Sequence, residues 1–335
     1  MTERWTADLG WDENWARTFD ACRCELDDPD LGVGRVTRAS RGRCWVDAGG
    51  EERAVHIPGR LHRDGAPPVV GDWIAIRVRS RRLFVAAILT RRTAFRRRRA
   101  GSVDGEQTVA ANIDAAFLVM GLDVDYSPRR LERYLALTYD SGAEPVVVLN
   151  KTDLCDDVRA RRAEIAAMTH AEVIALSARA MRDGVEPRDR LAPQLAPGRT
   201  VALLGSSGVG KSTLVNALLG FERMATNAVR TRDGRGRHTT THRQLIRLPS
   251  GALLVDTPGM RELGLVGGLD ALEDAFPDVA ELAASCRFTD CRHAGEPGCA
   301  VADALHNGTL PLPRWGSYLK LRTELSASAG PRRRS

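Results

Sequence analysis

The alternation of apolar and polar residues changes along the chain, and each pattern predicts a different kind of structure. Residues 31–93 contain short runs of alternating character, such as GDWIAIRV, in which Ile74, Ile76 and Val78 share one face. A period of two is typical of half-buried strands. About five such strands in so short a region favour a small β-barrel of the OB type.

The leader of the chain, residues 1–30, shows a helical period instead. Trp11, Trp15 and Phe19 recur every four residues, so they fall on one stripe of a helix. We expect this aromatic stripe to dock on the body of the protein.

The pattern changes again at Ala115, where short apolar runs begin to alternate with amphipathic stretches, for example AAFLVMGL followed by PRRLERYLALTYDSG. This alternation predicts a parallel sheet with helices on both faces. We therefore assign residues 94–265 to an α/β domain. Residues 266–335 form a helical C-terminal region with an embedded cysteine cluster, and we expect its basic end, ASAGPRRRS, to be disordered.

Composition narrows the class of protein. No apolar run approaches the ~18 residues of a membrane span, and the acidic start MTERWTADLG does not resemble a secretory signal. We expect a soluble, cytoplasmic protein with no membrane partner. The net charge of +6 permits a polyanionic partner. The run Arg96–Arg99 is either a solvated basic linker or a strip that contacts phosphates, and both interpretations stay open.

Lysine is rare, and its placement is informative. Only three of the 49 basic residues are lysines, and two of them fall within the strings NKTD and GKS. A guanidinium cannot replace a compact ammonium on a slim stem where the cation must enter a phosphate cradle. This placement indicates that both strings are functional motifs.

The string GSSGVGKS follows a predicted strand and opens a predicted helix, which is the context of a phosphate-binding loop. Backbone N–H groups and the helix N-terminus would hold the phosphates. Lys211 would reach the β- and γ-phosphates, and Ser212 would ligate Mg²⁺. The predicted loop residues are Gly205, Ser206, Ser207, Gly208, Val209, Gly210, Lys211, Ser212 and Thr213.

Two further motifs complete a guanine-nucleotide site. In DTPG, Asp256 would hold Mg²⁺ through water, and the Gly259 N–H would meet the γ-phosphate. In NKTD, Asp153 can accept hydrogen bonds from guanine N1–H and its 2-amino group, a pair of donors that adenine lacks. The predicted base-binding residues are Asn150, Lys151, Thr152 and Asp153, together with Ser177 and Ala178 of the later string LSA.

The order of these motifs is unusual. In an ordinary GTPase the phosphate loop precedes NKxD, whereas here NKTD comes about fifty residues before it. Because the strand ends of a parallel sheet lie side by side, a circular permutation can keep the pocket while moving the chain ends. We therefore predict a circularly permuted GTPase domain.

With these motifs in view, the sequence resembles the circularly permuted, ribosome small-subunit-dependent GTPases of the RsgA family. The strings NKTD, GSSGVGKST, GRHTTTH, DTPGMRELGL and CRFTDCRHAGEPGCAV carry the resemblance over nearly the whole chain. It implies an OB-type barrel, a permuted GTPase and a zinc-binding C-terminal region. It also implies GTP hydrolysis during late maturation of the small ribosomal subunit, with rRNA binding and ribosome-stimulated turnover by a monomer.

Catalysis needs a group that orients water, and Ras-like enzymes use a glutamine after D-x-x-G. Met260 occupies that position here. His238, in the string GRGRHTTTH, is the best candidate for this task, and the resemblance implies the same; the alternative is a solvent-exposed loop residue. Either Thr239 or Thr240 would close on Mg²⁺, and we favour Thr240.

The C-terminal cysteines have the composition of a metal site. Cys286, Cys291, His293 and Cys299 supply three sulfurs and one nitrogen within fourteen residues, the ligand set of a closed structural zinc site. The resemblance supports this assignment. We do not expect His306 to be a ligand.

Two other classes of function fit part of the pattern. One is a zinc-containing RNA-binding module whose nucleotide site does not turn over. The other is an ATP-dependent phosphotransferase, which Asp153 argues against because adenine would leave its carboxylate unpaired.

Overall fold

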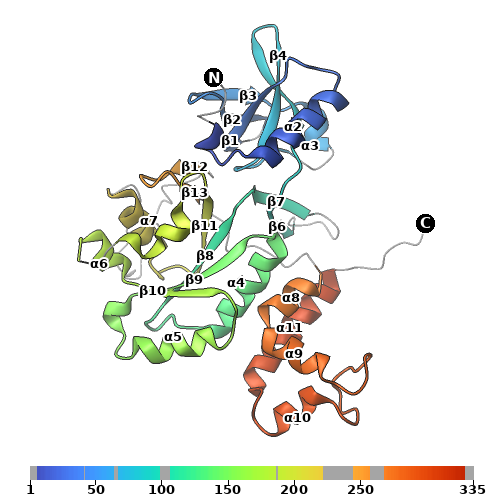
Figure 1. The fold of residues 1–335 in the computed structure, drawn as a ribbon, viewed down its shortest axis with the longest axis vertical. Coiled ribbons are helices and arrows are strands. Elements are labelled where there is room, and N and C mark those ends of the chain that lie inside the picture. Colours follow the sequence, from blue (N-terminus) through green and yellow to red (C-terminus); the bar gives the residue numbers. More distant parts are fainter. Residues whose placement is uncertain are drawn as a thin grey trace, which may run out of the picture.

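The computed structural model describes residues 6–40, 42–63, 67–98, 106–185, 188–221, 244–256 and 268–328. Figure 1 shows a β-barrel at the top, a sheet with its helices in the middle and a group of helices at the bottom. This order agrees with the three predicted parts. Within the described residues, no helix is long and apolar enough to cross a membrane.

The first part is a closed five-stranded barrel, as predicted. Its strands pair in the order β1-β2-β3-β5-β4 and return to β1, with only β3 and β5 parallel. Ile74 and Ile76 face its core, but Val78 is 63% exposed because the β4–β5 hairpin projects past the barrel (Figure 1). The elements are β1 (Gly32–Ser40), β2 (Arg43–Asp47), β3 (Glu52–His56), α3 (Gly59–Arg63), β4 (Trp73–Arg79) and β5 (Arg82–Ile88).

The aromatic leader docks on this barrel, as expected. Helix α2 (Glu13–Glu25) begins after Asp12, whose carboxylate caps the Trp15 amide at 3.0 Å. Trp15 is buried against Trp73 of β4, and Trp11 meets Trp73 edge-on with ring centroids 4.7 Å apart. The stripe thus buries aromatic surface that a lone helix would leave in water.

The described part of the arginine run, Arg96–Arg98, lies in a strand and not in a linker loop. Residues 94–98 form β6 (Ala94–Arg98), which pairs antiparallel with β7 (Glu106–Ala111). Phe95 anchors this hairpin because it is buried in the same hydrophobic cluster as helix α4 (Pro128–Ser141).

The central sheet has the predicted parallel architecture. Its strands lie in the order β10-β9-β8-β11-β13-β12, and all are parallel except β12, which is antiparallel to β13 and also pairs with β1 of the barrel. Strand β12 was not predicted. The strands are β8 (Ala115–Gly121), β9 (Glu144–Asn150), β10 (Glu172–Ala175), β11 (Thr200–Leu204), β12 (Gln244–Arg247) and β13 (Leu253–Asp256).

Alternate residues of the central strands serve two hydrophobic layers. Leu118 of β8 joins the layer under α4 and α5 (Val158–Ala166), whereas Phe117 joins the layer under α6 (Ala178–Arg182) and α7 (Lys211–Leu219). Both faces of the sheet are therefore covered. The segment between α6 and β11 also contains a 3₁₀ helix, η2 (Arg188–Leu195).

A buried arginine joins the barrel to the sheet. Arg35 of β1 is 2% exposed and donates hydrogen bonds to the carbonyls of Leu9, Gly71 and Asn112 and to Thr200 Oγ1. Burial lowers the pKa of this guanidinium to about 10, so it remains charged at neutral pH. Because these hydrogen bonds would be costly to break, Arg35 holds the barrel and the central sheet in a fixed position against each other.

The C-terminal helices rest on α4. Arg314 is 6% exposed and pairs with Glu132 of α4 at 3.0 Å and with Asp278 at 2.7 Å, while Arg133 forms a bidentate pair with Glu324. Hydrophobic residues of both parts share one cluster. The helices are α8 (Asp270–Ala275), α9 (Pro277–Ala284), α10 (Ala300–His306) and α11 (Leu312–Ser328).

Candidate nucleotide site and metal centre

The predicted nucleotide motifs converge at one edge of the sheet. NKTD follows β9, LSA follows β10, the phosphate loop follows β11, and Asp256 ends β13. In an open parallel sheet, ligands bind in the crevice outside the carboxyl ends of the strands. Strand β11, which leads into the phosphate loop, lies between β8 and β13. Motifs that come before the loop in the sequence and motifs that come after it therefore both reach it.

Backbone geometry explains the glycines of the loop. Gly205 has φ 149°, and a Cβ there would collide with the Val119 carbonyl of β8. Gly210 has φ 98° and precedes α7, and a Cβ there would collide with Asn150 Nδ2. Both positions need glycine because a side chain would push the loop away from its neighbours.

Lys211 lies over the loop. Its Nζ donates to the carbonyls of Gly205 at 2.7 Å and Ser206 at 2.5 Å. Ser212 and Thr213 occupy the first turn of α7 and are half-buried, whereas Ser207 and Gly208 are exposed at the tip of the loop. This arrangement leaves the helix N-terminus and the loop tip open to an anion.

Asn150 connects the two halves of the permuted site. It is 2% exposed; its Nδ2 donates to the Val209 carbonyl at 2.7 Å, and its Oδ1 accepts from the Ala178 amide at 2.8 Å. Asn150 therefore braces the base-binding loops against the phosphate loop. The N–H of Ala178, a predicted base-binding residue, is engaged with Asn150 in this structure.

The base-reading aspartate is held by the string LSA. Ser177 Oγ donates to Asp153 Oδ1 at 2.6 Å, which leaves Oδ2 of the exposed carboxylate toward solvent or ligand. The Thr152 amide bonds to the Leu176 carbonyl at 3.4 Å, so the two loops are also joined through their backbones.

Asp123 belongs to this site although no sequence motif indicated it. Asp123 follows β8 and receives a 2.5 Å ion pair from Lys151, which has a left-handed φ of 65°. A Cβ at Gly121 would crowd this pair. Burial raises the pKa of the Asp123 carboxyl, but hydrogen bonds from Lys151 and the Asp125 amide outweigh it and lower that pKa overall. The acidic string GLDVD after a strand was the available signal.

Several predicted residues lie outside the described part of the chain. They are the candidate water-positioning residue His238, the candidate Mg²⁺ ligands Thr239 and Thr240, and Gly259 and Met260 of the DTPG region.

The four predicted metal ligands come together between α9 and α10. Their ligand atoms all lie within 4.8 Å of one another. His293 Nδ1 is 3.6 Å from Cys286 Sγ and 3.5 Å from Cys299 Sγ, and the two sulfurs are 4.0 Å apart. Tetrahedral zinc with bonds of about 2.3 Å to sulfur and about 2.0 Å to nitrogen requires S–N distances of about 3.6 Å and S–S distances of about 3.8 Å. Cys286, Cys291, His293 and Cys299 therefore fit such an ion.

Neighbouring groups affect the protonation of His293 and the hydrogen bonding of Cys299. Burial, with the charge of Arg322 adding to it, lowers the pKa of His293, so the imidazole is neutral at neutral pH, the form that binds metal. Cys299 caps α10 and its Sγ accepts from the Ala302 amide at 3.4 Å.

Comparison with known proteins agrees with this geometry. The RsgA GTPase family model matches residues 88–266. The small ribosomal subunit biogenesis GTPase RsgA of Opitutus terrae is 48% identical over 96% of this chain and 90% of its own length. The protein of the same name from Xylella fastidiosa is 52% identical over 80% of each chain.

Solved structures show the same fold. The crystal structure of YjeQ from Thermotoga maritima has a TM-score of 0.63 and 25% identity, covering 90% of this chain and all of that one. The structure of YloQ, described as a circularly permuted GTPase, has a TM-score of 0.61 and 23% identity, covering 91% of this chain and 98% of its own.

Proposed function

The chain belongs to the RsgA GTPase family, and on that premise we propose that it hydrolyses GTP during late maturation of the small ribosomal subunit. Relatives that are about half identical over most of the chain are named small ribosomal subunit biogenesis GTPases. The observation that supports it best is Asn150, which ties NKTD to the phosphate loop despite the permuted order. The partners would be GTP, GDP and the small subunit with its rRNA, and the protein would act as a cytoplasmic monomer.

In this proposal each half of the site has one task. Asp153, oriented by Ser177, selects guanine, and Lys151, held by Asp123, lies along the base. The loop Gly205–Ser212 holds the phosphates, with Lys211 at the β- and γ-phosphates. Mg²⁺ would be held by Ser212 and Thr240, with Asp256 acting through water, and would offset phosphate charge when bound.

His238 is the proposed water-positioning residue. The support is from sequence: Met260 stands where Ras-like enzymes have a glutamine, and His238 adjoins the proposed Mg²⁺ ligand Thr240. In this proposal the ribosome brings the His238 side chain into place, which is why turnover would depend on the ribosome.

The cysteine cluster is proposed to hold one structural Zn²⁺. Four protein ligands fill a tetrahedral shell and leave no open position for chemistry. The loop with the four ligands lies between helices that rest on α4 through Arg314 and Arg133. This contact supports a role in which the nucleotide state alters how tightly the C-terminal region binds rRNA.

Phosphate release tests the proposed activity. Small ribosomal subunits are expected to raise the GTP hydrolysis rate of the purified protein. His238→Ala should lower that stimulated rate about 10²-fold, the scale of a lost positioning group, while GTP binding stays near normal.

Large ribosomal subunits at equal concentration provide the control for this assay. GTP binding without any stimulated hydrolysis would favour the alternative of an RNA-binding module with a nucleotide clamp. An unchanged stimulated rate in His238→Ala would reject only the role of His238.

A further inference from the structure

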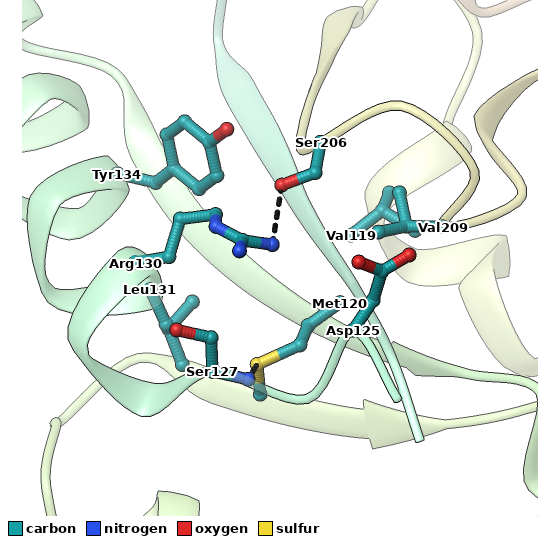
Figure 2. Close-up of a pocket in the computed structure, with 9 residues that line it drawn as sticks. All are labelled: Val119, Met120, Asp125, Ser127, Arg130, Leu131, Tyr134, Ser206 and Val209. Carbon is teal, nitrogen blue, oxygen red and sulfur yellow. Dashed lines mark hydrogen bonds between the residues drawn. The ribbon is translucent and has the colours of Figure 1, made fainter. Parts of the chain in front are cut away.

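Two cations converge on one residue of the phosphate loop. Lys211 Nζ donates to the Ser206 carbonyl, and Arg130 Nη1 donates to the Ser206 hydroxyl at 2.7 Å. Figure 2 shows the Arg130 side chain reaching from α4 to Ser206. Lysine of a phosphate loop serves the β- and γ-phosphates, so Arg130 stands at the terminal-phosphate end of the site.

Arg130 differs in its partners from Arg133 and Arg314, the two arginines that join α4 to the C-terminal helices. Those two guanidinium groups are paired with carboxylates. Among the residues that the structure describes, Arg130 forms no ion pair, and its hydrogen-bond partner is a neutral hydroxyl. It is exposed in the first turn of α4, so its guanidinium can turn without breaking a buried contact.

The pocket beside the loop also contains an acid. Asp125 lines the same pocket as Arg130, and its Oδ2 lies 3.5 Å from where a Cβ of Gly208 would be. This carboxylate would repel a bound phosphate, whereas Arg130 would attract it. A cation on this side of the loop therefore offsets the acid when an anion arrives.

We propose that Arg130 is a second cation for the terminal phosphate of GTP. The guanidinium leaves Ser206 Oγ and hydrogen-bonds the γ-phosphate from the α4 side, opposite the backbone cradle. A planar fork of donors matches phosphate oxygens better than an ammonium does. Arg130 then makes the site distinguish GTP from GDP. The inference rests on the proposed nucleotide site but not on the ribosomal partner.

Binding measurements on the full-length protein test this role. Dissociation constants for a non-hydrolysable GTP analogue and for GDP are compared at fixed ionic strength and Mg²⁺. Arg130→Ala should weaken the analogue about 10-fold, the scale of one charge-assisted hydrogen bond. Its GDP affinity should change less than about 2-fold, because GDP has no γ-phosphate. Arg130→Lys should retain part of the preference, since it keeps the charge but loses the fork.

A matched variant provides the control. Arg129→Ala removes the adjacent exposed arginine and should change neither affinity. Equal losses for analogue and GDP in Arg130→Ala, or no loss for either, would overturn the proposal. Wild-type protein that binds neither nucleotide would refute the nucleotide site itself, and with it the role of Arg130.

Discussion

Replacing Asp153 with asparagine is expected to change the base preference of the nucleotide site from GTP to xanthosine triphosphate. The carboxylate accepts hydrogen bonds from guanine N1–H and the 2-amino group, and xanthine carries a carbonyl in place of that amino group. The substituted amide would keep an oxygen for the 2.6 Å bond from Ser177 Oγ and turn its NH₂ toward the base. A site built to hydrogen-bond one donor pattern rejects the mismatched one strongly, so the preference should shift by about 10³-fold or more.

Competition between GTP and xanthosine triphosphate for the purified protein measures this change. Asp156→Asn alters an exposed acid three residues away in the same loop and should leave the preference for GTP intact. An Asp153→Asn variant that retains full GTP affinity and still rejects xanthosine triphosphate would refute the assignment of the base pocket.

Removing a metal ligand is expected to unfold the C-terminal region. The loop between α9 and α10 carries the four proposed ligands, and Cys299 also caps α10. Binding of structural zinc contributes folding free energy, with apparent values of about 10–16 kcal/mol in small zinc domains. Cys291→Ala should therefore reduce bound zinc from about one ion per chain to almost none, and amides of α9 and α10 should exchange much faster with solvent.

Metal analysis and hydrogen exchange on the same preparations measure both effects. Cys24→Ala removes an exposed cysteine outside the cluster and should leave zinc content and exchange unchanged. The sheet strands β8 and β9 should keep their protection, because their core includes many residues that do not depend on the metal. A Cys291→Ala variant that still binds one zinc per chain would contradict the ligand assignment.

Most of the sheet was predicted because its buried parallel strands are continuous apolar runs that alternate with helical stretches. Strand β8 has seven residues that are all buried, and α4 ends at Gly142, whose φ of 82° suits a left-handed cap. Strand β12 was missed because only two of its four residues, Leu245 and Ile246, are apolar, whereas the equally short β13 is part of an apolar run. Strand β6 was missed because consecutive arginines hide its alternation, although Phe95 anchors it in the core.

The candidate site also contains residues that could be predicted from the sequence and residues that could not. Motif residues such as Lys211 and Asp153 are recognisable because phosphate and guanine each demand a particular residue type at a particular spacing. Asp123 and Arg130 belong to no motif and gain their positions only when β8 and α4 fold against the loops. The buried pair of Arg314 with Glu132 joins residues 182 positions apart, a contact that neither local pattern nor composition could predict.

Co-sedimentation with small ribosomal subunits tests most directly the claim that this is a nucleotide-controlled ribosome assembly factor. At fixed ionic strength, binding should be clearly tighter with a non-hydrolysable GTP analogue than with GDP, because only a difference in contacts between two states can couple the sites. Both affinities should fall with added salt, as expected for phosphate contacts by a basic protein, and large subunits should bind weakly in either state. Equal affinity for small subunits in both nucleotide states, or equal binding to large subunits, would contradict the account.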